Sequence, residues 1–310
     1  MSAVVADGVS KFYGDAVAVS DLTFALPAGV TGLLGHNGSG KSTTLALLAG
    51  WSAPSDGTVR VLGRDPRADV DVHRGLGVVP DGDGLWPFLT ARQTVTTLAA
   101  QRGVADPGAA ADRALHRVGL VEAADRRVAR YSKGMRQRVR LAQALAHEPE
   151  VLLLDEPLNG LDPAQRRADV DLVRALGAEG RTVLVSSHVL AEVERMADRL
   201  LVLVDGRLLA EGPPAAIRAA MVDRPRQVRL AADRPRVLAA ALLADGAARA
   251  VELDDDDGLL VTTDRAQELA RVLAPTAQAH GVVLRRVEPV GEDLESVFTA
   301  LTRAVRGAGR

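Results

Sequence analysis

The stretch from residue 35 to residue 43, Gly-His-Asn-Gly-Ser-Gly-Lys-Ser-Thr, constrains this chain more than any other part of the sequence. It matches the pattern G-x-x-x-x-G-K-[ST], in which glycines let the backbone wrap around a phosphate and point its N–H groups inward. The apolar run Val30–Leu34 before it suits a buried strand, and residues 44–49 suit a helix ended by Gly50. This order of strand, loop and helix favours a phosphate-binding loop over a glycine-rich turn that matches by chance.

Two side chains of the loop have specific expected roles. Lys41 is expected to reach the β- and γ-phosphates, and the Ser42 hydroxyl to ligate Mg²⁺. The helix that follows turns the positive end of its dipole toward the anion. The residues expected to surround the nucleotide are Gly35, Asn37, Gly38, Ser39, Gly40, Lys41, Ser42 and Thr43. The loop predicts nucleotide binding, but it does not distinguish among kinases, GTPases and motor ATPases.

Composition excludes several classes of protein. The chain has 310 residues, which allows one large or two modest domains, and 47% of them are hydrophobic, which is enough for a sizeable core. The formal net charge is −2 and aromatic residues make up 3%, so neither a basic field nor a base-stacking surface points to nucleic acid. Without cysteine, disulfide and thiolate chemistry are excluded, which fits a reducing compartment.

No segment of the sequence predicts direct contact with a membrane. The first residues lack the charged start and long apolar stretch of a signal peptide. The longest apolar runs, Val151–Leu154 and Leu200–Val204, are the size of strands, far below the roughly 18–20 residues that span a bilayer. We therefore expect a soluble chain, and any role at a membrane must come through a partner.

Residues 1–222 read as an α/β domain, because continuous apolar strands alternate with helices as in a sheet covered on both faces. Between about residues 89 and 147 the pattern becomes purely helical. Thr90, Asp106 and Ser132 are expected to cap the three helices of this helical subdomain.

Proline-rich turns near residues 213–214 and 223–225 predict a domain boundary. Residues 223–310 follow in the order β-α-β-β-α-β of a ferredoxin-like α+β domain. The acidic run Asp254–Asp257 falls at a hairpin position and lacks the alternating ligand spacing of an EF-hand, so a solvated tip is expected rather than a calcium site. An amphipathic helix is expected at Glu292–Leu301.

Two acids follow the buried strand Val151–Leu154. In a parallel sheet, ligands gather at the carboxyl ends of the strands, which is where Asp155 and Glu156 would lie. Together with the phosphate loop, Asp155 is expected to be a partner of Mg²⁺ (the Walker B position). Glu156 is expected to orient and deprotonate the attacking water.

A further set of motifs makes the chain resemble one family. Residues 131–137, Tyr-Ser-Lys-Gly-Met-Arg-Gln, resemble the signature motif of ABC-transporter ATPases, in the variant common among drug and lipid exporters of the daunorubicin-resistance type. Residues 158–163 resemble the D-loop of that family, Ser187-His188 its switch histidine, and Tyr13 its adenine-stacking aromatic residue. These motifs occur in the family's order over roughly the first 220 residues. The ending around residues 288–298 resembles, more loosely, the extension of the exporter group.

The resemblance implies an ABC ATPase cassette, a mixed sheet with helices and a helical subdomain, followed by a small α+β domain. Ser132 and Gly134 would face the γ-phosphate held by a second subunit, Asp162 would lie at the nucleotide in the D-loop, and His188 would sense the γ-phosphate. ATP and Mg²⁺ are then the implied ligands, bound twice between two head-to-tail chains of a homodimer. The implied activity is ATP hydrolysis that powers export through a separately encoded permease, at the cytoplasmic face of the cell membrane.

Asp81 departs from the family pattern, which usually has Gln after the short strand that ends at Val79. Asp is one methylene shorter and charged, yet a carboxylate suits Mg²⁺, so we expect Asp81 to keep the metal-sensing role with altered hydrolysis. Lys133 replaces the first signature glycine, as in other members of the exporter group. Trp86 and Phe88 are expected either to meet a helix of the membrane subunit or to be buried in the chain's own core.

The sequence predicts no catalytic or metal-binding role for several other charged or titratable side chains. Arg136 and Arg138 read as surface charges of a helix. The remaining histidines show no metal-ligand spacing; they are His36, His73, His116, His147 and His280.

Three other readings stay open at this point. The first is an ABC ATPase that acts in DNA repair or on ribosomes, but the chain lacks the long inserts or second cassette of those types. The second is a non-hydrolysing regulator, which the intact Glu156 and His188 disfavour. The third is an ABC importer ATPase. The transported substrate cannot be read from this sequence.

Overall fold

The computed structural model describes residues 2–82, 84–188, 190–219, 226–254 and 258–290. The chain forms two compact units, Met1–Pro214 and Ala215–Arg310, which are described separately. Most of the expected acidic hairpin tip (residues 255–257) and the expected helix at residues 292–301 lie outside the described residues.

A six-stranded sheet forms the centre of the first unit. Its strands, in spatial order, are β5 (Leu76–Val79), β6 (Val151–Asp155), β7 (Thr182–Ser187), β3 (Gly29–Leu34), β8 (Arg199–Val204) and β9 (Arg207–Gly212). The first five run parallel and β9 runs antiparallel to β8. The side chains of Val151–Leu154 are fully buried because both faces of the sheet are covered, which explains why β6 is continuously apolar.

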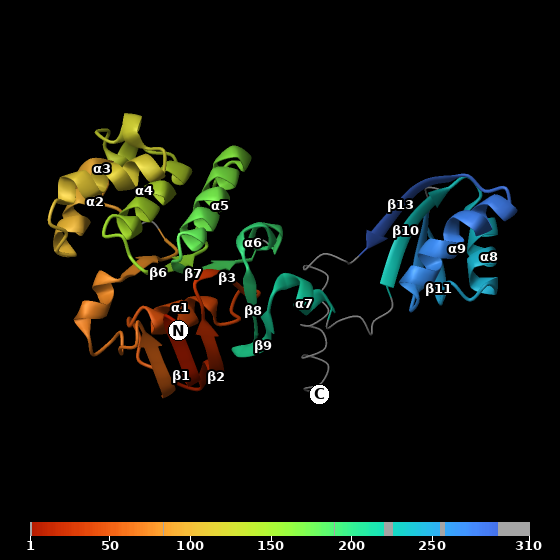
Figure 1. Ribbon diagram of the computed structural model, residues 1–310, viewed down its shortest axis with the longest axis horizontal. Helices are drawn as coiled ribbons and strands as arrows, with labels where there is room; N and C mark the ends of the chain where they lie inside the picture. The colour runs from red at the N-terminus through yellow and green to blue at the C-terminus, as the bar shows by residue number, and fades with distance from the viewer. Residues whose placement is uncertain (1, 83, 189, 220–225, 255–257, 291–310) are drawn as a thin grey trace. The chain divides into compact units, whose positions relative to one another are not determined.

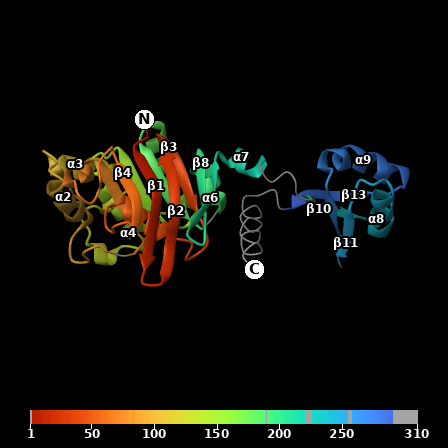
Figure 2. The same ribbon diagram turned by 90° about the horizontal axis from the view of Figure 1, so that it is seen from below.

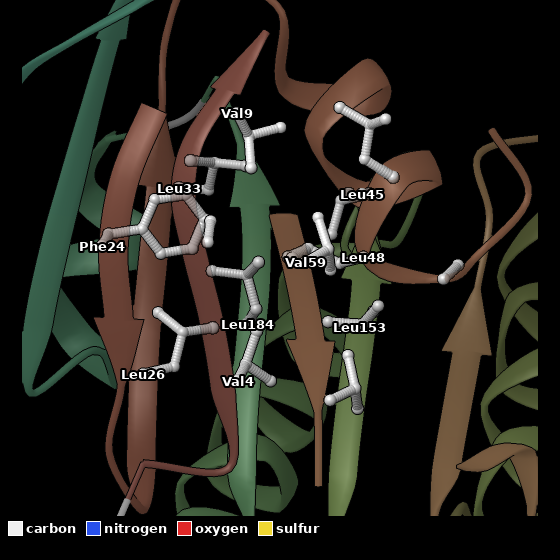
Figure 3. Close-up of a cluster of buried hydrophobic side chains, with 14 of the residues drawn as sticks. Val4, Val9, Phe24, Leu26, Leu33, Leu45, Leu48, Val59, Leu153 and Leu184 are labelled. Carbon is white, nitrogen blue, oxygen red and sulfur yellow. The ribbon is translucent and has the colours of Figure 1, made fainter. Parts of the chain in front are cut away.

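A second, three-stranded antiparallel sheet packs over one face of the first. It consists of β2 (Ala16–Leu26), β1 (Val4–Tyr13) and β4 (Asp56–Val61), which lie side by side in Figure 2. Val4, Phe24 and Leu26 from this sheet share one buried cluster with Leu153 and Leu184 from the six-stranded sheet (Figure 3). Helix α1 (Lys41–Leu48) adds Leu45 and Leu48 to that cluster, so the phosphate loop is anchored in the main core.

The helical subdomain lies to one side of the sheets (Figure 1). Its helices are α2 (Ala91–Gln101), α3 (Pro107–Arg117) and α4 (Lys133–Leu145), with short 3₁₀ turns at Val121–Ala123 and Val128–Arg130. The expected caps are confirmed: the side chains of Thr90, Asp106 and Ser132 each accept a hydrogen bond from a backbone N–H in the first turn. A further 3₁₀ turn spans Val70–Arg74 before β5.

The strand β9 was not expected from the sequence. It pairs antiparallel with β8, and the hairpin turn between the two strands consists of Asp205 and Gly206, which both have positive φ (46° and 79°). An Asp-Gly pair between two apolar runs is among the strongest short-range hairpin signals, so the information for β9 is present in the sequence. The helices α5 (Pro163–Ala178) and α6 (Leu190–Met196) complete the first unit, and α7 (Pro214–Ala219) begins at its last residue and continues into the second.

Beyond α7, the described residues of the second unit form a four-stranded antiparallel sheet with two helices. The strands β10 (Arg226–Ala232), β11 (Ala250–Asp254), β12 (Gly258–Thr263) and β13 (Leu284–Val290) pair in the order β11-β12-β10-β13. Helices α8 (Pro235–Ala244) and α9 (Ala266–Ala279) add Leu238, Leu242 and Leu269 to its own core. This chain order and strand order are those of a split β-α-β unit.

His147 has no catalytic assignment, yet it makes the fold sensitive to acid. Burial lowers the pKa of His147 from 6.5 to about 4, against a hydrogen-bonding contact to the Leu76 carbonyl that raises it, and Arg102 and Arg181 lower it further. As the pH falls, His147 therefore takes up a proton near pH 6.5 in the unfolded chain but only near pH 4 in the folded chain. Stability from this group is complete above pH 6.5 and is lost as the pH falls toward 4.

The variant His147→Gln stays neutral at every pH and keeps a donor for the Leu76 carbonyl. Between pH 7 and pH 4, wild type should lose about 2 kcal/mol of unfolding free energy relative to this variant, once partial solvent screening is allowed for. Urea unfolding of both proteins at the two pH values measures the difference. Parallel pH profiles would show that His147 is not the titrating group.

Candidate nucleotide-binding and hydrolysis site

The phosphate loop connects the end of β3 to the start of α1, as expected. Gly40 precedes the helix with φ 102°, and a Cβ there would lie 2.6 Å from the Ala18 carbonyl oxygen of β2. Only glycine fits this left-handed position and this close approach of two backbones. The loop is thus shaped by the neighbouring antiparallel sheet as well as by its own sequence.

Lys41 lies inside the loop and is buried. Its ammonium donates hydrogen bonds to the carbonyl oxygens of Gly35 (2.7 Å) and His36 (3.3 Å). Burial lowers the pKa of Lys41, while the negative charges of Glu156 and Asp155 act in the opposite direction. The loop lysine therefore interacts electrostatically with the two acids at the end of β6, although more than 100 residues separate them in the sequence.

The donor set fits a phosphate and a magnesium ion. The Ser39 hydroxyl is buried within the loop and has no hydrogen-bond partner among the residues that the structure describes. A buried hydroxyl of this kind needs an acceptor or donor from a ligand or water. The hydroxyl of Ser42, in the first turn of α1, and the carboxylate of Asp155 supply the oxygen atoms that Mg²⁺ prefers.

Asp155 and Glu156 are held by β7, the strand next to β6. Ser186 lies opposite Asp155 in the pairing of β6 with β7. Its hydroxyl donates a hydrogen bond to the Asp155 carboxylate and accepts one from the Glu156 N–H (3.0 Å). Glu156 has φ 47°, which is rare for a residue other than glycine. Ser186 was not identified from the sequence, because only the strand order makes it a neighbour of Asp155.

Glu156 contacts the expected switch histidine. Its Oε2 atom lies 2.8 Å from Nδ1 of His188, which follows the end of β7. The Glu156 side chain is 13% exposed and that of His188 is 52% exposed. The carboxylate is therefore largely buried, and the imidazole is the accessible member of the pair. A base whose orientation is set by a neighbouring imidazole is the arrangement expected for activating a water molecule.

The signature and D-loop residues pack against each other within one chain. Ser132 caps α4, and Asp162 caps α5 by accepting hydrogen bonds from the N–H groups of Ala164 and Gln165. A Cβ on Gly134 would lie 2.3 Å from the Gln165 side chain. Gly134 is therefore needed for this close contact.

Lys133, which replaces a signature glycine, has a packing partner in the D-loop. A Cβ on Gly160 would lie 2.6 Å from the Lys133 side chain. The bare Gly160 backbone thus makes room for the long side chain, which compensates for the departure from the usual motif.

Tyr13 ends β1 at the hairpin to β2 and is 53% exposed. The Lys11 ammonium lies 5.0 Å from the centre of the Tyr13 ring and also donates to the Ala53 carbonyl. A cation–π contact with Lys11 thus helps to hold the Tyr13 ring in place, and much of the surface of the ring stays accessible.

Asp81 follows β5, the strand on the other side of β6, and is exposed. The Pro80 carbonyl before it accepts a hydrogen bond from Arg140 of the signature helix α4 (3.0 Å). Arg140 was not identified from the sequence, since nothing local marks it as a link between this loop and α4.

The other two arginines of α4 make local contacts. Arg136 donates to the Tyr131 carbonyl (2.7 Å) and Arg138 to the Val118 carbonyl (3.3 Å). Both side chains are partly exposed, and each satisfies a backbone acceptor at a turn of the helical subdomain.

The structure contradicts one of the two expectations for Trp86 and Phe88. They are 42% and 67% exposed, so the alternative of core burial is wrong. The segment that carries them is fixed to the helical subdomain by hydrogen bonds from Val128 N–H to the Leu89 carbonyl and from Ala129 N–H to the Pro87 carbonyl. Two large aromatic side chains are therefore presented to solvent by an ordered segment.

Comparison with known proteins identifies the family. A family model described as "ABC transporter" matches residues 19–159. Nod factor export ATP-binding protein I of Paraburkholderia xenovorans (strain LB400) is 40% identical over 225 residues, which cover 71% of this chain and 74% of that protein. The chain belongs to the ATP-binding proteins of ABC transporters. It is therefore a nucleotide-binding ATPase with the expected α/β cassette fold.

Two further relatives of the ABC cassette support this assignment. The daunorubicin/doxorubicin resistance ATP-binding protein DrrA of Streptomyces peucetius is 34% identical over 306 residues, which cover 97% of this chain and 92% of that protein. A solved ATP-binding cassette, dimeric in a post-hydrolysis state and bound to ADP and Pi, superimposes with a TM-score of 0.63. It is 25% identical and covers 68% of this chain and 98% of its own. ABC cassettes of transporters form dimers and pair with membrane components.

None of the helices in the described part of this ABC cassette is both long and apolar enough to cross a membrane.

Proposed function

We propose that this chain is the ATP-hydrolysing subunit that powers export through a separately encoded membrane permease. The observation that carries the hydrolytic part is the convergence of Lys41, Asp155, Glu156 and His188 from separate segments onto one edge of the sheet. The direction of transport rests on relatives whose names describe Nod factor export and daunorubicin/doxorubicin resistance.

The residues divide the work of hydrolysis. Tyr13 stacks on the adenine, and the loop from Gly35 to Thr43 holds the phosphates, with Lys41 neutralising the β- and γ-phosphates. Ser42, Asp155 and Asp81 hold Mg²⁺, which supplies charge neutralisation at the phosphates when bound. Glu156 takes the proton of the attacking water and His188 holds that carboxylate in place, as their 2.8 Å contact supports.

A second copy of the chain completes each site. Ser132 and Gly134, at the N-terminus of the 13-residue helix α4, present backbone N–H groups suited to an anion. We propose that they face the γ-phosphate on the partner chain, with Asp162 of the D-loop beside them. Two ATP molecules then lie between two head-to-tail cassettes, and closure and reopening of this homodimer drive the permease.

The remaining assignments concern position in the cell and domain roles. Residues 1–222 form the cassette, with its helical subdomain at about 89–147, and residues 223–310 an accessory domain. The complex lies at the cytoplasmic face of the cell membrane, and the chain touches the membrane only through the permease. The exposed Trp86 and Phe88 support a docking role toward a permease helix.

Purification of the chain with and without a candidate permease tests the export proposal. ATPase activity should depend on the permease, and the two proteins should co-purify. Activity that is indifferent to the permease, with no co-purification, would favour an ABC ATPase outside transport. An importer would instead give uptake of substrate into intact cells, and vesicle transport assays separate the two directions.

The variant Asp81→Gln tests the role of the unusual carboxylate. We expect its steady-state ATPase rate and its Mg²⁺ dependence to differ from wild type, because a neutral, longer amide replaces a charged ligand. Phosphate release over a magnesium titration measures both. An unchanged rate and unchanged Mg²⁺ dependence would remove Asp81 from the metal site.

A further inference from the structure

A charged pair connects the D-loop helix α5 to the short helix α6. Arg166 lies in the first turns of α5, and its Nε atom is 2.9 Å from Oε1 of Glu192 on α6. Arg166 also reaches back to the D-loop, since its Nη2 atom donates to the Leu161 carbonyl (3.4 Å). One guanidinium therefore contacts both the D-loop and α6.

Glu192 is a largely buried acid that interacts electrostatically with the catalytic pair. Its side chain is only 9% exposed, and burial raises the pKa of its carboxyl, while the charges of Arg166 and His188 lower that pKa and the charge of Glu156 raises it. A buried carboxylate in this place needs a cation, because an uncompensated charge would repel Glu156 and compete for His188.

Helix α6 depends on such contacts for its position. It has seven residues, Leu190–Met196, and helices this short are not stable by themselves in water. Val193 of α6 packs closely against Gly32 of β3. A Cβ at position 32 would lie only 2.1 Å from the Val193 side chain, so this contact requires glycine. Glu192 is its ionic contact to α5, and His188 stands just before the helix.

The Arg166–Glu192 contact is close but not aligned as a hydrogen bond. Within the described part of the chain, neither Nε of Arg166 nor Oε1 of Glu192 has a hydrogen-bond partner, although the two atoms are 2.9 Å apart. A small movement of α5 relative to α6 would change this contact strongly, since hydrogen bonds depend on angle as well as distance. The pair is therefore suited to transmit a D-loop movement to α6.

We propose that Arg166 and Glu192 are positioning residues that hold α6 and His188 so that Glu156 is oriented for hydrolysis, and that they link this orientation to the D-loop. This inference rests on the proposed role of Glu156 as the base. Neither residue touches the adenine-stacking Tyr13 or the phosphate loop in the described contacts, so ATP binding should be spared.

Five variants in the full-length chain, assayed with its permease, test the proposal. Arg166→Gln leaves Glu192 uncompensated, Glu192→Gln removes the carboxylate charge, the double variant removes both charges, and Arg166→Lys keeps a positive charge at position 166. Arg167→Gln is the matched control, because Arg167 is the exposed neighbouring arginine on the same helix and, among the described residues, no ion pair joins it to Glu192, Glu156 or His188.

For Arg166→Gln we expect kcat to fall by about 10-fold or more while the KM for ATP stays within about twofold, the pattern of a group that acts on the reaction step. The double variant should recover several-fold over Arg166→Gln, because the two residues are coupled and the unpaired charge is gone. Arg166→Lys should restore part of the rate as a point charge. Arg167→Gln should match wild type.

Hydrogen–deuterium exchange provides a readout that does not depend on activity. Exchange in the peptide covering residues 190–196 should rise in Arg166→Gln and stay at the wild-type level in Arg167→Gln. Additive losses in the double variant, unchanged α6 exchange, or equal losses in Arg167→Gln would each overturn the proposal.

The variant Glu156→Gln, assayed in the same experiment, distinguishes the proposed role of Glu156 as the base from the positioning role of Arg166 and Glu192. If Glu156→Gln abolishes hydrolysis and Arg166→Gln does not affect it, only the positioning role fails. If Glu156→Gln hydrolyses ATP at the wild-type rate, the proposed base fails, whatever the Arg166 variants do.

Discussion

Replacing Glu156 by Gln should lower ATP hydrolysis by about 10²–10⁴-fold, the range typical for loss of a general base. The amide has nearly the same shape and still contacts His188, but it cannot accept the proton of water. Nucleotide binding relies on other residues, so ATP should remain bound. Because closure then occurs without the step that reopens the dimer, an ATP-bound dimer should accumulate.

Phosphate release and size-exclusion chromatography at saturating ATP and Mg²⁺ measure the two effects. Glu122→Gln, an exposed acid in the 3₁₀ turn at Val121–Ala123, is the matched control and should behave as wild type. A Glu156→Gln protein that elutes only as a monomer would count against the two-half-site mechanism. Undiminished hydrolysis would assign the base to another group.

Replacing Lys41 by Ala should weaken ATP binding by about 10–100-fold, since a hydrogen bond to a charged group contributes about 1.5–3 kcal/mol. Lys41 is also a buried cation that interacts electrostatically with Asp155 and Glu156. Without it, the two carboxylates would meet the phosphates unscreened. Binding and hydrolysis should therefore both fall, in contrast to the selective effect of Glu156→Gln.

Equilibrium titration with a fluorescent ATP analogue measures this loss. Arg60→Ala removes one positive charge from an exposed site on β4 and controls for net charge. Unfolding by urea should show Lys41→Ala to be folded before its affinity is interpreted. Wild-type affinity in a folded Lys41→Ala protein would show that the loop does not hold the phosphates through this side chain.

Local features of the fold were predictable from sequence, because neighbouring residues encode them. The glycine pattern defined the phosphate loop, and Thr90, Asp106 and Ser132 marked helix starts through their own side chains. The apolar runs predicted the strands of the central sheet. The hairpin to β9 was missed, although its Asp205-Gly206 turn is also a local signal.

The expected residues of the site were found as motifs, but the sequence did not show how they meet. Glu156 contacts His188 because β6 and β7 are neighbours in the sheet, and the same adjacency brings Ser186 to Asp155. The fit of Lys133 over Gly160 depends on α4 and the D-loop packing together. None of these contacts lies within one local segment.

The sequence by itself determined which chemical groups this ABC cassette carries and on which type of element each one lies. Only the tertiary structure decided that Trp86 and Phe88 face solvent, and that Arg166 and Glu192 connect the D-loop to the helix behind His188. The physical reason is the range of the interactions. Caps, turns and strands depend on residues a few positions apart, whereas burial and ion pairing depend on the order in which distant strands and helices pack.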